Sequence, residues 1–211
     1  GADALRLNTT GDGNTAVGAD ALDGNTTASN NTAVGYRALT INTTGADNVA
    51  VGGEALYTNN ANDNTAIGKA ALRLNTTGAN NTGIGRKALE ENTTAAYNTA
   101  LGSGALRLNT TGGNNTAVGG VALENNTTAA NNTALGNEAL RANTTGHSNT
   151  AVGSLALDAN TTENYGTAIG YNALTANTSG TNPTAIGAYA LSANTTGDYN
   201  TACGYSALEN N

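Results

Sequence analysis

Apolar residues recur along the chain in two short groups, separated by glycine and surrounded by Asn and Thr. Residues 31–39 read Asn-Thr-Ala-Val-Gly-Tyr-Arg-Ala-Leu, and this order returns from one end of the chain to the other. Gly, Asn and Thr are poor helix formers, and groups this short do not follow a helical period. The pattern therefore predicts one short strand at the Thr-Ala-aliphatic group and a second at the Ala-Leu pair, with tight turns between them.

One glycine sets the register of a tandem repeat. Successive copies lie 17 residues apart, except for one step of 16 between Gly52 and Gly68. The repeat glycines are Gly1, Gly18, Gly35, Gly52, Gly68, Gly85, Gly102, Gly119, Gly136, Gly153, Gly170, Gly187 and Gly204. A fixed period is typical of repeat architectures, so residues 1–211 are expected to form a single repeat array. Its uncapped ends indicate a piece of a longer array or a filament subunit.

A unit of 17 residues is too short for a pair of helices but long enough for two short strands and two turns. Stacked in parallel, such units form a solenoid whose coils rise ~4.8 Å each, so about twelve coils reach roughly 60 Å. The sequence therefore predicts an all-β, parallel β-solenoid (a β-roll) of about 12 coils. We expect it to self-associate side by side, end to end, or both.

The faces of the predicted strand follow from the alternation of side chains. With the repeat glycine as position 0, the aliphatic residue at position −1 is expected to face inward, opposite the Leu at position 4. This predicted core ladder is Val17, Val34, Val51, Ile67, Ile84, Leu101, Val118, Leu135, Val152, Ile169, Ile186 and Cys203. The Ala at position −2 should then point outward, where its constant small size suggests packing against an identical chain.

Asn recurs at positions −4 and 7, where it suits turn geometry and can hydrogen-bond to its copies along the stack. The Asn at position 7 also opens an Asn-x-Thr or Asn-x-Ser acceptor sequence for glycosylation. These candidates are Asn8, Asn25, Asn42, Asn75, Asn92, Asn109, Asn126, Asn143, Asn160, Asn177 and Asn194. Two interpretations stay open: a glycan on this row, attached to Asn or Thr, or a turn whose composition creates the acceptor sequence by itself.

Composition excludes several classes of partner. The net charge is −7 and we see no basic cluster, so we expect no nucleic-acid binding. No apolar run approaches the ~20 residues that a membrane helix needs, so we expect no membrane insertion. Phe, Trp and Met are absent, which suits a thin core of small aliphatic residues.

No catalytic or metal-binding constellation is visible. His147 is the only histidine and lies at a variable turn position, and the carboxylates are not paired at a repeated spacing. The only cysteine, Cys203, is interpreted as a small buried hydrophobe. We therefore expect a protein that is not an enzyme and has no cofactor or metal.

The motif Asn-Thr-Ala-Val/Ile-Gly-x-x-Ala-Leu resembles the head repeats of bacterial trimeric autotransporter adhesins, and related repeats of phage tail-fibre and bacterial surface proteins. Matching residues include Ala16-Val17-Gly18, Ala66-Ile67-Gly68 and Ala185-Ile186-Gly187, so the likeness extends over the whole chain. The resemblance implies a parallel β-roll with three chains packed side by side. The repeat here is longer, because Asn-Thr-Thr-Gly lies between the strands.

Together these observations predict a non-enzymatic, extracellular structural protein: a fibre- or filament-forming solenoid acting as an adhesin shaft or surface fibre, on a cell or a virion. Its expected partners are copies of itself, as a trimer or filament, and a host surface or glycan. The alternative is an ice-binding β-solenoid, in which the regular Asn-x-Thr row forms a flat, hydroxyl-rich face. A carbohydrate-active enzyme on a parallel β-helix is disfavoured, because the carboxylates do not cluster.

Overall fold

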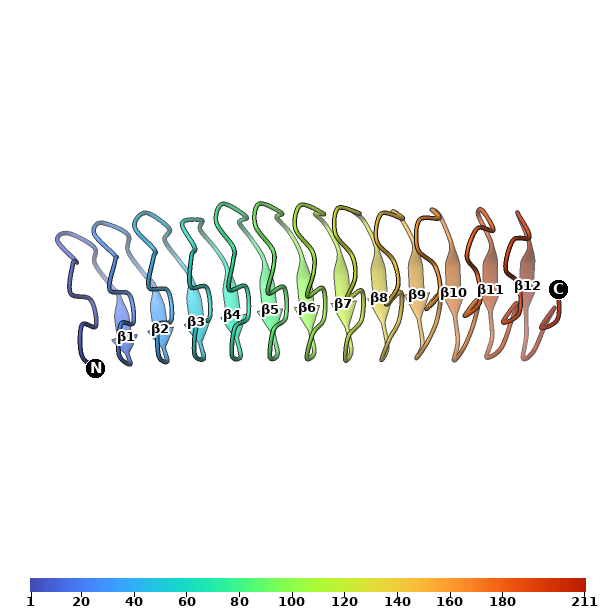
Figure 1. Ribbon diagram of the computed structural model, residues 1–211, viewed down its shortest axis with the longest axis horizontal. Coiled ribbons are helices and arrows are strands. Elements are labelled where there is room, and N and C mark those ends of the chain that lie inside the picture. Colours follow the sequence, from blue (N-terminus) through green and yellow to red (C-terminus); the bar gives the residue numbers. More distant parts are fainter.

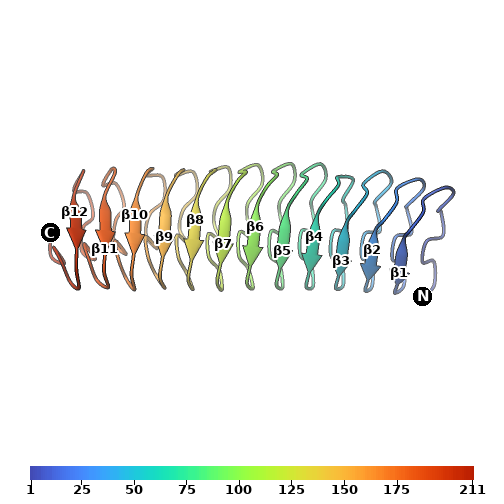
Figure 2. The same cartoon turned by 180° about the vertical axis from the view of Figure 1, so that it is seen from behind.

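The computed structural model describes residues 1–211 as one stack of coils, with the two termini at opposite ends (Figure 1). Each coil contributes one strand to a single parallel sheet, whose strand order follows the sequence. The strands are β1 (Thr15–Val17), β2 (Thr32–Val34), β3 (Val49–Val51), β4 (Thr65–Ile67), β5 (Thr82–Ile84), β6 (Thr99–Leu101), β7 (Thr116–Val118), β8 (Thr133–Leu135), β9 (Thr150–Val152), β10 (Thr167–Ile169), β11 (Thr184–Ile186) and β12 (Thr201–Cys203). From behind, all twelve arrows point the same way (Figure 2). The predicted all-β parallel solenoid is confirmed.

Neighbouring strands pair in the register that the repeat glycines predict. Thr32 lies beside Val49, and Ala33 beside Ala50. The one repeat of 16 residues does not shift this register, because β3 and β4 still pair Val51 with Ile67. The missing residue is absorbed in the turn after Asn59, so the strand is the fixed part of each coil.

The predicted second strand, at the Ala-Leu pair, is wrong. Positions 2 and 4 of nearly every coil have positive φ angles, such as 56° at Arg37 and 52° at Leu39, which a strand does not allow. The segment is a series of turns whose backbone still bonds from coil to coil: the Leu39 N–H donates to the Ala55 carbonyl at 3.0 Å. Only 22 of the 135 backbone hydrogen bonds lie within strands, so the turns also hold the stack together.

The predicted assignment of strand faces is also wrong. The Ala at position −2 points into the core and is fully buried at Ala33, Ala50 and Ala100. The predicted core residues at position −1 face outward instead, as half-buried or exposed side chains. They are Val17, Val34, Val51, Ile67, Ile84, Leu101, Val118, Leu135, Val152, Ile169, Ile186 and Cys203. The Cys203 thiol is exposed as well, so it is not a core residue.

The reason for this inversion is the width of the core. Each coil fills its interior with a buried Leu at position 4, the Ala at position 3 and two Asn side chains. At Gly83, which replaces the inward Ala, a Cβ atom would already lie 3.4 Å from Leu72 Cγ and 3.3 Å from the Ala88 carbonyl oxygen. The space opposite Leu therefore admits one methyl group, and a Val or Ile would overpack it.

Two rows of buried Asn line the same interior. At position 7, Asn92 Nδ2 donates to Asn75 Oδ1 of the preceding coil at 2.8 Å and to the Ala95 carbonyl of its own coil at 3.0 Å. At position −4, the Asn98 backbone N–H donates to Asn81 Oδ1 at 2.9 Å. The predicted Asn ladders are confirmed, and they satisfy amides that would be costly to bury unpaired.

The repeat glycine is required by a close approach between coils. Gly102 has φ +142°, and a Cβ atom there would collide with the carbonyl oxygen of Gly119 in the next coil. Only glycine combines this backbone conformation with this contact. The repeat glycines therefore recur along the sequence with the period of the coils.

Candidate functional site

The outward face of the sheet is built from two uniform rows. Position −3 is Thr in every strand except β3, where Val49 takes its place, and position −1 is aliphatic in every strand except β12. The exposed fraction is 56% at Val17, 45% at Leu101 and 42% at Ile186. We call these two rows, residues −3 and −1 of β1 to β12, the Thr/aliphatic face. It contains no charged residue.

Charged side chains lie elsewhere, and many pair along the stack. Position 5 alternates in sign over six successive coils: Arg73, Glu90, Arg107, Glu124, Arg141 and Asp158. Within this charged row, Arg107 Nε donates to Glu124 Oε1 at 2.9 Å. Arg73 Nε lies 3.5 Å from Glu90 Oε1, and Arg141 Nε lies 3.3 Å from Asp158 Oδ1. Partly exposed pairs of this kind contribute little stability singly, but their order favours one register.

The Asn glycosylation candidates are not available in this fold. Asn25, Asn42, Asn75, Asn92, Asn109, Asn126, Asn143, Asn160, Asn177 and Asn194 are at most 1% exposed. Their Nδ2 groups donate within the core, as Asn92 illustrates. Asn8, in the first coil, is half-buried and donates Nδ2 to the Gly11 carbonyl at 3.0 Å. A glycan on Nδ2 of a buried Asn would break the ladder, so this fold disfavours the Asn candidates and favours the interpretation that the turn composition creates the acceptor sequences.

The Thr residues that follow these Asn lie at the surface. Thr43 and Thr44 are both exposed. At the same position as Thr43, the hydroxyl of Thr76 donates to the Thr93 carbonyl of the next coil at 2.9 Å. The same bond recurs at Thr93 and Thr110, so these hydroxyls belong to a structural turn.

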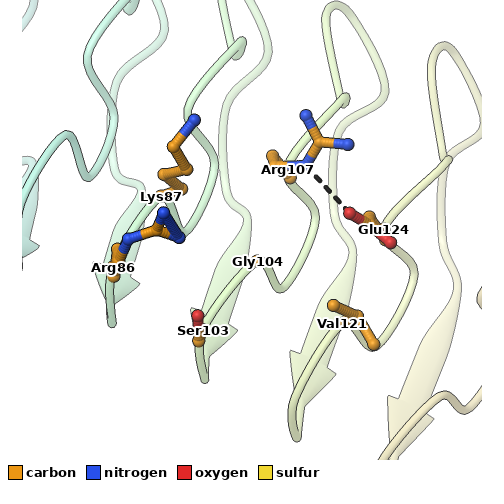
Figure 3. A pocket seen from close by; sticks show the side chains of 7 residues that line it. All are labelled: Arg86, Lys87, Ser103, Gly104, Arg107, Val121 and Glu124. Atoms are coloured by element: carbon orange, nitrogen blue, oxygen red, sulfur yellow. Dashed lines mark hydrogen bonds and ion pairs between the residues drawn. The ribbon is translucent and has the colours of Figure 1, made fainter.

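Two shallow hollows lie on the surface. The first, of about 260 Å³, is lined by Arg86, Lys87, Ser103, Gly104, Arg107, Val121 and Glu124 (Figure 3). The second, of about 230 Å³, is lined by Glu163, Asn164, Tyr165, Thr181, Asn182 and Tyr199. Sequence reasoning missed the first. The signal was available, because Arg86, Lys87 and Arg107 stand at nearby positions of two successive repeats.

The remaining candidate residues do not come together in a reactive or metal-binding cluster. His147 Nδ1 lies 3.2 Å from Ser148 Oγ, and its ring meets Tyr165 edge to face at 5.2 Å. Nowhere do three His, Cys, Asp or Glu side chains come together as metal ligands. No helix has the length and apolar character needed to cross a bilayer.

Two carboxylates have shifted pKa values. Hydrogen bonds from the Thr181 backbone N–H, at 2.9 Å, and hydroxyl, at 2.8 Å, lower the pKa of Asp198. Burial raises the pKa of Asp158, and Arg141 only partly offsets this effect. Both pKa shifts arise where one coil packs against the next, so the stacking of the coils explains them without a reaction site.

Comparison with known proteins gives no relative. No protein-family model matches the chain, and no curated protein or solved structure matches it significantly.

Proposed function

We propose that the chain is a non-enzymatic structural solenoid that assembles with copies of itself into an extracellular fibre or surface shaft. The observation that carries this proposal is the Thr/aliphatic face. A row of half-buried or exposed Val, Ile and Leu side chains runs through β1 to β11 without a single charge. Continuous apolar surface of this kind marks interaction sites in soluble proteins.

The size of the face suits pairing with a second copy. Twelve rungs of ~4.8 Å and a width of three residues give roughly 600 Å² per chain, so two copies would bury about 1,200 Å² in total, near the lower limit for specific interfaces. Two flat sheets with small and medium side chains can stack about 10 Å apart. The partner is thus another chain of the same kind, packed sheet against sheet.

The rest of the coil supports a mechanical role. Backbone bonds and Asn ladders join each coil to the next along the whole stack. Force applied along the stack is therefore spread over many bonds in each coil. The extracellular setting rests on the resemblance to adhesin head repeats, and the variable residues at positions 1 and 2 would form the displayed surface.

Sedimentation velocity over a range of protein concentrations tests the proposal. We expect the wild-type chain to form dimers or larger species, and a Leu101→Lys/Leu135→Lys variant of the Thr/aliphatic face to remain monomeric. Leu7→Lys/Ile41→Lys is the matched control, because Leu7 and Ile41 are equally exposed but lie off the sheet. A wild-type chain that is monomeric at all concentrations, or a control that dissociates equally, would contradict the proposal.

The same face supports a second candidate function, ice binding. The Asn-Thr-Thr row is less suited to this role, because its Asn is buried and the hydroxyl of Thr76 is already bonded to the next coil. The sheet instead presents a hydroxyl row beside a methyl row at the constant rung spacing of ~4.8 Å. Thermal hysteresis of the purified protein discriminates the two functions. Hysteresis that a monomeric chain shows, and that Thr99→Lys/Thr133→Lys abolishes, favours ice binding. Hysteresis equal to that of an inert control protein excludes ice binding.

A further inference from the structure

One stretch of this acidic chain is basic. Five of the eight Lys and Arg residues lie between positions 69 and 107, where only Glu90 and Glu91 are acidic; the other three cations stand among thirteen carboxylates. The five are Lys69, Arg73, Arg86, Lys87 and Arg107. They occupy positions 1, 2 and 5 of three consecutive coils, so the stack gathers them on one side of the solenoid. A local excess of one charge focuses the potential even when the net charge is opposite.

Three of these cations, Arg86, Lys87 and Arg107, line the first hollow. Arg86 and Lys87 come from one coil, and Arg107 and its partner Glu124 lie across from them, with Ser103 and Gly104 between (Figure 3). The floor is open because Gly104 has no side chain, and a Cβ atom there would lie 3.1 Å from Val121 Cγ1. The hollow, of about 260 Å³, is small, so it fits one group of a larger ligand.

The protein does not neutralise all of this charge. Arg107 is paired with Glu124 within the charged row. Glu90 is shared, lying 3.5 Å from Arg73 and 3.1 Å from Lys87 Nζ. Arg86 and Lys69, at position 1, make no ion pair, and the Arg86 guanidinium donates no hydrogen bond within the protein. Its five N–H donors are therefore free for a ligand.

We propose that this hollow binds a sulfate or phosphate ester carried on a polysaccharide. The guanidinium fork of Arg86 matches two oxygens of such a group, Lys87 adds a second charge, and the Ser103 hydroxyl adds a neutral donor. Lys69 and Arg73, one coil back, extend the positive surface toward the next ester along the polymer. No aromatic side chain lines the hollow, so it lacks the stacking platform by which proteins hold single-stranded nucleic acid.

Isothermal titration calorimetry with dextran sulfate, dextran phosphate and unmodified dextran tests this site. We expect one or both esters to bind, and unmodified dextran not to bind. Arg86→Gln/Lys87→Gln should weaken binding at least tenfold. The control Arg6→Gln/Arg37→Gln removes the same charge from paired residues outside the hollow and should change affinity less than twofold. The ester that binds more tightly identifies the group.

Three outcomes would overturn the proposal: no binding of either ester, equal binding of unmodified dextran, or the same loss of affinity in the two double variants. The last would mean that affinity follows net charge alone. Circular dichroism of each variant checks the fold, which Arg86→Gln should leave intact because that side chain makes no ion pair or hydrogen bond. The proposal does not depend on self-association, since the hollow lies off the Thr/aliphatic face.

Discussion

Pro183 lies one coil beyond Gly166, in the position −4 row that otherwise carries Asn, and the two residues compensate for each other. From Asn31 to Asn149 the backbone N–H of each residue in this row donates to the Oδ1 atom of the preceding Asn, and Gly166 itself donates to Asn149 at 2.7 Å. Gly166 has no Oδ1 to offer, and Pro183 has no N–H that needs one. Both residues are buried, so an unmatched N–H would be costly here.

This relationship predicts strong coupling between the two positions. Pro183→Ala should lower the free energy of unfolding by about 1–3 kcal/mol, because it buries an unpaired N–H. Gly166→Asn should be more favourable by at least about 1 kcal/mol when residue 183 is Ala than when it is Pro. Urea denaturation of the four proteins of this double-mutant cycle measures the difference. An identical effect of Gly166→Asn in both backgrounds would refute the pairing.

The inward direction of Ala100 can be tested against its neighbour. Ala100→Val should destabilise the fold by about 1–3 kcal/mol, because the space facing Leu admits only a methyl group. Leu101→Val, on the outward face, should change stability by less than about 1 kcal/mol. Urea denaturation at a protein concentration where both variants are monomeric checks this order. The reverse order would restore the face assignment drawn from sequence.

Val121 is a β-branched residue held at φ 50°. Its N–H donates to the Ser103 carbonyl at 2.9 Å, so the backbone bonding between coils fixes this conformation. Asn tolerates the left-handed region better, and Asn172 occupies the same repeat position at φ 54°. Val121→Asn should therefore raise the free energy of unfolding by about 1 kcal/mol. Val118→Asn in β7 should lower the free energy of unfolding, since Asn is unfavourable in a strand. Thermal melts measure both variants, and stability changes of the same sign would argue against backbone strain at Val121.

Asp158 and Asp198 should give opposite pH dependences. The pKa of Asp158 is raised above its ordinary value of 3.8, so its charged form is disfavoured in the fold at neutral pH, and this penalty fades as pH falls toward 3.8. Asp158→Asn should thus be more stable than wild type at pH 7, with the difference shrinking toward pH 4. The pKa of Asp198 is lowered, so its contribution is present above 3.8 and lost as pH falls through its folded pKa.

The matched variant Asp198→Asn should accordingly be less stable than wild type at pH 7, and the deficit should vanish only in more acidic solution. Urea denaturation at pH 7, 5 and 4 measures both differences. The two variants serve as controls for each other. Stability changes of the same sign at pH 7 would mean that the burial of Asp158 and the hydrogen bonds from Thr181 to Asp198 do not set these pKa values.

The coil and its register could be predicted from sequence because each depends on a single strict requirement. The approach of Gly102 to Gly119 tolerates no side chain, so the glycine must recur at every coil. Even the 16-residue step between Gly52 and Gly68 is readable, since Asn59 keeps its place and the loss falls in the turn.

The faces of the strand could not be predicted by ranking side chains by size. Val34 is larger and more apolar than Ala33, which favours it for a core, but the buried Leu and Asn leave room only for the smaller residue. The constancy of Ala, together with Gly83 as its one exception, was the signal of a tight interior. The basic hollow escaped for another reason: Arg86 and Arg107 are distant in sequence, and only the stack brings them to one hollow.

Because every coil presents the same bonding groups upward and downward, a whole repeat can be inserted or removed without creating a new type of contact. Recombination between repeats would then change the length of the solenoid and leave its cross-section and its contacts between coils unchanged. The ladder interruption at Gly166 and Pro183 is the exception, because these two coils must be inherited together.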